Sequence, residues 1–256
     1  MTPKMKKNTA NRSNYGEPRR TTDIRYIVLH YTANDGDNDE GNANYFHSNV
    51  VKASAHYFVD DDSITQSVPD DYTAWSVGGS LYSDHVKTGG GRLYGIATNR
   101  NTLNIEMCDT KKDGVIRAQE STVDNTIWLA RRKMKQYNID IDHVIRHFDV
   151  NGKHCPAYLM DEQAWKKFRA RIMGYELGRA YRMTKACYLR LTPAGQKVAY
   201  GDLPKSMRKK CRNAKGTAMI KYGKTFVLTD FKAIGSELWG RTQWGYWLPL
   251  KSVKVK

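Results

Sequence analysis

The sequence contains no apolar run that approaches the ~18–20 residues needed to cross a bilayer. Its longest strand-like apolar run covers only Tyr26–Leu29. Residues 1–13 carry lysine and arginine but no apolar stretch, so they do not have the pattern of a secretory signal. The sequence therefore excludes an integral membrane protein, and we expect synthesis in the cytoplasm without a signal peptide.

Cysteine is also scarce, with four residues in a chain of 256. The four are widely spaced in the sequence, which excludes the disulfide scaffold of small secreted domains. We expect reduced thiols, with Cys187 and Cys211 unpaired. No internal repeat is visible, so a repeat architecture is not expected.

Acidic residues are rare in the last third of the chain. Residues 175–256 hold 18 basic and 4 acidic residues, a net charge of +14, whereas residues 1–174 hold 24 and 22. This imbalance predicts a folded body followed by a module that binds polyanions. Nucleic acid, an acidic membrane and an anionic cell-wall polymer are all candidate partners. A merely solubilising surface is the alternative, although the charge far exceeds what solubility needs.

The length suits two domains, for which we predict residues 23–174 and 175–256. Residues 1–22 are polar and basic and are predicted to form a poorly ordered arm. Hydrophobic patterns predict strands at 26–32, 54–60, 63–68 and 103–108, a strand end at 144–148, and helices at 43–49, 121–137 and 161–173. In the second part, short β-type runs between turn residues predict a small barrel, with strands at 186–191, 218–221, 225–228 and 246–250.

Three residues are candidate zinc ligands: His30, His147 and Cys155. His30 ends an apolar strand, and the turn Asn151-Gly152 can fold His147 and Cys155 towards one ion. Two histidines and one cysteine leave a fourth position open, as in catalytic zinc sites. Zinc lowers the pKa of a bound water from about 15.7 to about 7. The spacing alone is weak evidence, and a core histidine with a buried cysteine is the alternative.

Two charged residues are candidates for catalysis. Glu106 lies in an apolar strand, where a carboxylate is costly to bury unless it has a partner or a function. It is a candidate to take a proton from water at the metal. Lys153 lies two residues before Cys155, where its charge can neutralise a developing oxyanion. A salt bridge for Glu106 and a solvated loop position for Lys153 are the alternatives.

Four segments occur in the order YIVLHYTAN (26–34), SAHYFVDDDSITQSVP (54–69), NTLNIEMC (101–108) and VIRHFDVNGKHCPAY (144–158). Together they resemble the zinc-dependent N-acetylmuramoyl-L-alanine amidases of the type-2 amidase superfamily, over about residues 24–172. The resemblance implies an α/β fold, with a mixed β-sheet flanked by helices and a zinc site in a surface groove. It places the zinc ligands at His30, His147 and Cys155, the general base at Glu106, and the lysine before the third ligand at Lys153.

The chain departs from the family pattern at two motifs. Asn104 stands where the family's I-G-I-E run has glycine, and Trp75-Ser76-Val77-Gly78 replaces an aromatic-His-Ala-Gly run. Trp75 is therefore a candidate to contact substrate. His56 stands where the family carries a polar or aromatic residue near the zinc, so it is a candidate to contact substrate or to support the metal ligands, with a structural role as the alternative. The remaining histidines match nothing in the family and are expected at the surface: His47, His85, His143 and His154.

Residues 180–254 more weakly resemble bacterial SH3-like wall-binding modules, which are small all-β barrels. The resemblance rests on YLRLTP (188–193) and SELWGRTQWGYWLPL (236–250). The candidate wall-binding residues are aromatic: Trp239, Trp244, Tyr246 and Trp247. Burial in the core is the alternative, because aromatic side chains dominate small β cores.

These resemblances imply a zinc-dependent hydrolase that cleaves the amide bond between N-acetylmuramic acid and L-alanine in peptidoglycan. Its expected partners are peptidoglycan and an anionic wall polymer. The expected context is a phage or prophage endolysin, made in the cytoplasm and released to the wall through a separate membrane pore. A recognition protein that binds without cutting is one rival. A nucleic-acid-binding protein is another, but it would not explain the ligand set, so no nucleic-acid partner is expected.

Overall fold

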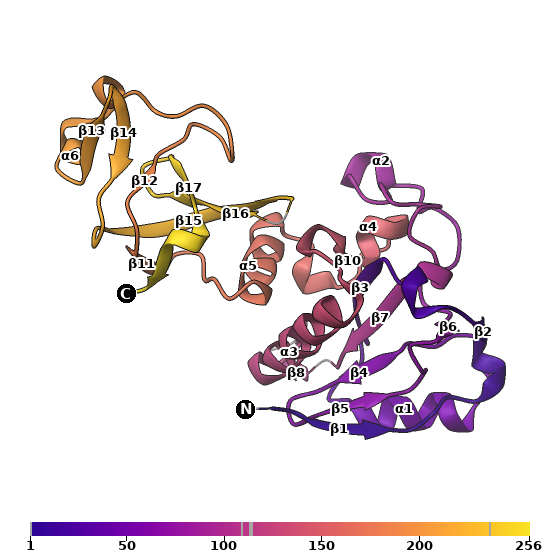
Figure 1. The fold of residues 1–256 in the computed structure, drawn as a ribbon. Helices are drawn as coiled ribbons and strands as arrows, with labels where there is room; N and C mark the ends of the chain where they lie inside the picture. Colours follow the sequence, from indigo (N-terminus) through magenta and orange to yellow (C-terminus); the bar gives the residue numbers. More distant parts are fainter. Residues whose placement is uncertain (1, 109, 113–114, 236) are drawn as a thin grey trace. The chain divides into compact units, whose positions relative to one another are not determined.

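The computed structural model describes residues 2–108, 110–112, 115–235 and 237–256. The chain forms two compact units, residues 1–165 and 166–256. The division falls inside helix α5 (Glu162–Ile172), somewhat before the boundary that we predicted after residue 174. Each unit is described by itself below (Figure 1).

A six-stranded sheet forms the centre of the first unit (Figure 1). β4 and β5 run antiparallel, and the other neighbouring strands run parallel, so the sheet is mixed as expected. In sheet order the strands are β1 (Lys4–Lys7), β5 (Ser63–Gln66), β4 (Tyr57–Val59), β7 (Thr102–Met107), β3 (Tyr26–Tyr31) and β10 (Val144–Arg146). The residues Ile27, Val28 and Leu29 are successive and all buried, as expected for a strand covered on both faces.

Helices pack against this sheet. α3 (Glu120–Tyr137) packs on β3, β4 and β7, and α1 (Asp39–Ser48) packs on β4 and β5. α1 begins earlier than predicted because the Asn38 side chain caps it by accepting a hydrogen bond from the Gly41 backbone. The shorter elements are α2 (His85–Thr88), α4 (His147–Asn151), β8 (Thr110–Lys112), β9 (Val115–Arg117), and the 3-10 helices η1 (Arg12–Asn14), η2 (Thr21–Asp23), η3 (Asn99–Asn101), η4 (Ile141–His143) and η5 (Ala157–Leu159).

The structure contradicts the predicted arm at residues 1–22. β1 adds a strand to the edge of the central sheet, and β2 (Tyr15–Pro18) pairs with β6 (Tyr72–Ala74). Arg19 is buried, and its guanidinium donates hydrogen bonds to four backbone carbonyl groups, those of residues 70, 99, 100 and 102. Polar residues do not make this segment disordered, because the fold supplies partners for their backbone and side chains.

The second unit is built mainly of antiparallel strands in two sheets, in agreement with the predicted all-β class. One sheet has the order β17 (Trp247–Pro249), β16 (Glu237–Thr242), β15 (Thr225–Ile234), β11 (Ala180–Met183) and β18 (Val253–Val255). The other has the order β12 (Cys187–Tyr188), β14 (Thr217–Ile220) and β13 (Cys211–Ala214). Its helical segments are α6 (Lys205–Arg208), η6 (Tyr200–Asp202) and η7 (Leu250–Ser252). A specifically SH3-like barrel stays a prediction.

Candidate metal centre

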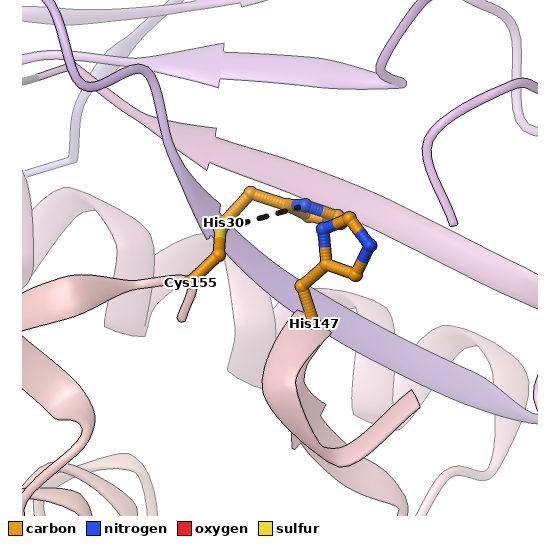
Figure 2. Close-up of side chains that lie close together, drawn as sticks. All are labelled: His30, His147 and Cys155. Atoms are coloured by element: carbon orange, nitrogen blue, oxygen red, sulfur yellow. Dashed lines mark hydrogen bonds between the residues drawn. The ribbon is translucent and has the colours of Figure 1, made fainter. Parts of the chain in front are cut away.

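The three predicted zinc ligands come together at one edge of the central sheet. His30 lies near the end of β3, and His147 begins α4 directly after β10. β3 and β10 are parallel neighbours, with Arg146 paired to Leu29, so their carboxyl ends meet at this edge. Cys155 reaches the same place from the loop after α4 (Figure 2). The turn at Gly152, with φ of 89°, reverses the chain between the second and third residues.

The cluster has the geometry of a metal site. The candidate ligand atoms of His30, His147 and Cys155 all lie within 4.8 Å of one another, and the three residues are buried. The Cys155 Sγ is 4.0 Å from His30 Nδ1, and the centres of the two imidazole rings are 4.7 Å apart. Both ring nitrogens of His147 are buried without a hydrogen-bond partner in the described part of the chain. Such groups are costly to bury, and a metal ion would satisfy one of these nitrogens.

The electrostatics favour neutral histidines. Burial, together with the nearby charge of Lys153, lowers the pKa of His30 to about 4 and that of His147 to about 2. A neutral imidazole keeps a lone pair on one nitrogen, and that is the form that binds a metal. The described residues therefore present two nitrogens and one sulfur, the donor set that zinc accepts.

Asn104 fixes the orientation of His30. Its Oδ1 lies 3.0 Å from His30 Nε2, and its Nδ2 donates to Thr102 Oγ1. Because an amide oxygen only accepts hydrogen bonds, Nε2 carries the imidazole proton, and the lone pair is on Nδ1. That is the nitrogen that faces Cys155. Hydrogen bonds of this kind set the tautomer of metal-binding histidines.

Glu106 lies beside the cluster. It is paired with His30 across β7 and β3, and its Oε1 is 3.8 Å from His30 Nδ1. Its side chain is 20% exposed, so a small molecule can reach it. Lys153 is exposed on the loop that leads to Cys155, close enough for its charge to act on both histidines. Both residues predicted to take part in catalysis are thus near the ligand cluster.

His56 is not part of the ligand cluster. It is fully buried; its Nδ1 accepts the Asn104 backbone N–H, and its Nε2 lies 2.7 Å from an Arg19 nitrogen and 3.2 Å from the Tyr72 carbonyl oxygen. Burial, with the adjacent Arg19 charge, lowers its pKa to about 3. These contacts favour the structural alternative. Trp75 is partly exposed, and its backbone N–H donates to Ser54 Oγ, so a role in substrate contact stays a prediction.

The aromatic candidates of the second unit separate into two groups. Trp239 is buried in the core, in agreement with the alternative reading. Trp244, Tyr246 and Trp247 are partly exposed and stay candidates for binding.

All four cysteines are free, as expected. In the described residues, no helix is long and apolar enough to cross a membrane.

A buried ion pair that sequence reasoning did not predict lies next to His147. Arg146 is almost completely buried, and its guanidinium contacts both carboxylate oxygens of Asp149 and donates to the Leu159 carbonyl. The backbone N–H of Arg146 also donates to Asp149, which fixes the start of α4. The available signal was an arginine within the apolar run that precedes His147.

Comparisons with known proteins agree with this geometry. The sequence model of a family described as N-acetylmuramoyl-L-alanine amidase matches residues 20–158. The amidase CwlA of Bacillus subtilis (strain 168) is 30% identical over 174 residues, which cover 67% of this chain and 58% of CwlA. CwlH of the same organism is 32% identical over 158 residues, which cover 61% of this chain and 56% of CwlH.

Two solved structures are similar to the first unit. The catalytic domain of XlyA matches with a TM-score of 0.51 at 26% identity, covering 66% of this chain and 98% of that domain. A mutant endolysin from Bacillus subtilis matches with a TM-score of 0.52 at 26% identity, covering 67% and 99%. The chain spans about half the length of the curated relatives it matches. Because the family model covers more than half of the chain, the protein belongs to the N-acetylmuramoyl-L-alanine amidase family.

Proposed function

We propose that the protein hydrolyses the amide bond between N-acetylmuramic acid and L-alanine in bacterial peptidoglycan. The observation that carries the proposal is the buried cluster of His30, His147 and Cys155 with the carboxylate of Glu106 beside it. A recognition protein needs no such combination of metal ligands and adjacent acid. Family membership supports the same substrate and bond.

The residues fit a zinc ion. Two neutral histidine nitrogens and one cysteine sulfur leave a fourth position for water or substrate. Zinc in such a site supplies a Lewis acid that lowers the pKa of a water and polarises a carbonyl group. His147 has a particular need for a partner, because both of its ring nitrogens are buried and unsatisfied in the described structure.

The chain's own groups supply the proton transfers and charge stabilisation. Glu106 accepts a proton from the attacking water and later delivers it to the amine of the leaving L-alanine. Its position, 3.8 Å from the His30 nitrogen that faces the cluster, suits this role. Lys153 places a positive charge near the same point, where it stabilises the oxyanion that forms on the lactyl carbonyl. Asn104 keeps His30 in the tautomer that the site requires.

The test is to incubate the purified protein with sacculi and to identify the soluble products by mass spectrometry. We expect stem peptides with a free L-alanine amino group, absent with a zinc chelator and restored by zinc. New reducing sugar ends would instead indicate a glycosidase. Protein that stays on the pellet without releasing any product would favour the recognition protein.

We also propose that the second unit holds the enzyme on the wall through an anionic polymer. Its net charge and its weak resemblance to SH3-like modules support this role, and the partly exposed Trp244, Tyr246 and Trp247 are candidate contacts. We propose a phage or prophage endolysin that is made in the cytoplasm and reaches the wall through a separate pore. The similarity to an endolysin from Bacillus subtilis supports this context.

A further inference from the structure

The second unit contains a long segment with charges of one sign only. Residues 203–229 hold eight lysine or arginine residues and no aspartate or glutamate. The segment covers α6, the β13–β14 hairpin and the start of β15. Within this segment, a polyanion would therefore meet cationic side chains and no acidic ones.

The strand register places three of these cations on the outward side of one small sheet. Cys211 and Ile220 are paired and buried, so they mark the inward side. Arg212 and Met219, the next pair, therefore point outward. The same alternation puts Lys210 and Lys221 outward, and they are neighbours because the Lys221 N–H donates to the Lys210 carbonyl.

Aromatic side chains border these cations. Tyr188 is paired with Met219 and so lies on the outward side, with the Lys197 ammonium 4.1 Å from its ring centre. The Lys210 ammonium lies 5.3 Å from the ring centre of Trp244. We define the basic face as this surface: Tyr188, Lys197, Lys210, Arg212, Met219, Lys221 and Trp244.

The charges of the basic face are not compensated within the chain. In the part that the structure describes, Lys197, Lys210, Arg212 and Lys221 take part in no ion pair; the ion pairs of this unit lie elsewhere. The Arg212 guanidinium instead lies 2.9 Å from the Met219 sulfur. Like charges that face each other across two strands cost stability, and Lys210 and Lys221 continue this pairing just beyond β13 and β14. An external anion would remove that cost.

We propose that the basic face binds a phosphodiester polymer of the bacterial cell wall; this rests on the proposed wall-directed function. The Cβ atoms of neighbouring basic positions are spaced about 5 Å across the strands and about 7 Å along them, which suits a chain with closely repeated negative charges. The planar fork of arginine matches phosphate oxygens. A neutral glycan would leave the cations unpaired, and no acidic residue in 203–229 opposes a polyanion.

The test measures binding of the full chain to purified walls on ice, with a chelator present so that the walls stay intact. One wall sample keeps its phosphodiester polymers, and the other has lost them by extraction with hydrofluoric acid. The test variant is Lys210→Gln, Arg212→Gln and Lys221→Gln together. The matched control is Lys232→Gln, Lys254→Gln and Lys256→Gln, which removes the same charge from exposed positions outside the basic face.

We expect the parent to bind extracted walls at least about tenfold more weakly than intact walls. On intact walls, the test variant should show the same loss of affinity, and the control variant should bind like the parent. In a plot of log affinity against log salt, the test variant should lower the slope by on the order of one per removed cation. Equal losses in the two variants, or unchanged binding to extracted walls, would overturn the proposal. So would tighter binding to duplex DNA than to the isolated wall polymer at equal phosphate concentration.

Release of peptides from small soluble muropeptides is measured in parallel and separates the two proposals. If the parent cleaves these substrates but the basic face fails the binding test, only the inference about the face is wrong. If the parent cleaves nothing yet binds walls through the basic face, the proposed catalytic function is wrong, and the inference about the binding surface is supported.

Discussion

Replacing Asn104 with alanine tests how the protein prepares His30 for a metal. The substitution removes the oxygen that accepts the Nε2 proton of His30 at 3.0 Å. A buried N–H without a partner costs about 1–3 kcal/mol, and the imidazole gains freedom to move its proton to Nδ1. The Nδ1-protonated form cannot offer the lone pair that faces Cys155. We therefore expect weaker metal binding with the three ligand residues intact.

The expected size follows from the lost hydrogen bond. Removing an outer partner of a metal-binding histidine weakens metal affinity about 10–100-fold, which corresponds to about 1.4–2.8 kcal/mol. This range agrees with the cost of leaving the Nε2 proton unsatisfied. Competition with a chromophoric zinc chelator measures the affinity. The ¹⁵N shifts of the His30 ring in the metal-free protein report the tautomer directly.

Asn14→Ala is the matched control. Asn14 is also a fully buried asparagine of the first unit, and its amide bonds to four backbone groups within residues 46–52. Its replacement should lower the free energy of unfolding but leave zinc affinity unchanged. Zinc affinity of Asn104→Ala within about twofold of the parent would refute the reasoning. An equal loss of affinity in both variants would attribute the effect to general destabilisation.

Three further predictions concern catalysis, pH and folding. Glu106→Gln should lower the rate of peptide release by about 10²–10³-fold or more with zinc affinity nearly unchanged; turnover close to that of the parent would contradict the assigned proton transfer. The free energy of unfolding should fall as the pH drops from about 6.5 towards 3, because the unfolded chain takes up a proton that buried His56, with its pKa of about 3, does not. Denaturant titrations at several pH values in this range measure how steeply the free energy of unfolding depends on pH. This dependence should be smaller by roughly 1.4 kcal/mol per pH unit in His56→Gln than in the parent. The same dependence in variant and parent would exclude His56 as the source. Arg146→Gln leaves the Asp149 carboxylate buried without its main partner and should cost about 3–5 kcal/mol of unfolding free energy; a cost below about 1 kcal/mol in thermal or denaturant unfolding would show that the pair does not hold α4.

Local sequence was enough to predict the strands that carry the candidate site. The run Tyr26–Leu29 contains β-branched and aromatic residues, a composition typical of a buried strand, and this places His30 near the strand's end. The turn at Asn151-Gly152 similarly predicts the reversal that returns the chain to the same edge. The order of the segments, through the family resemblance, then predicted that His147 and Cys155 would lie beside His30.

Contacts between distant segments could not be predicted in this way. Arg19 looks like a surface residue in a polar segment, because nothing local shows that carbonyl groups 51 to 83 positions away will accept its hydrogen bonds. Asn104 was recognised only as a departure from the family glycine, since its contact depends on the register between β7 and β3. Trp239 shows the same limit: whether an aromatic residue is core or surface depends on how two sheets pack.

The most direct test of the central claim is to measure peptide release while zinc is added back to metal-free protein. If His30, His147 and Cys155 form one catalytic site, release should rise in proportion to zinc and stop rising at one equivalent per chain. His147→Ala should abolish both the high-affinity binding and the release. Release that does not depend on zinc, or that persists in His147→Ala, would contradict the assignment of this cluster as the catalytic centre.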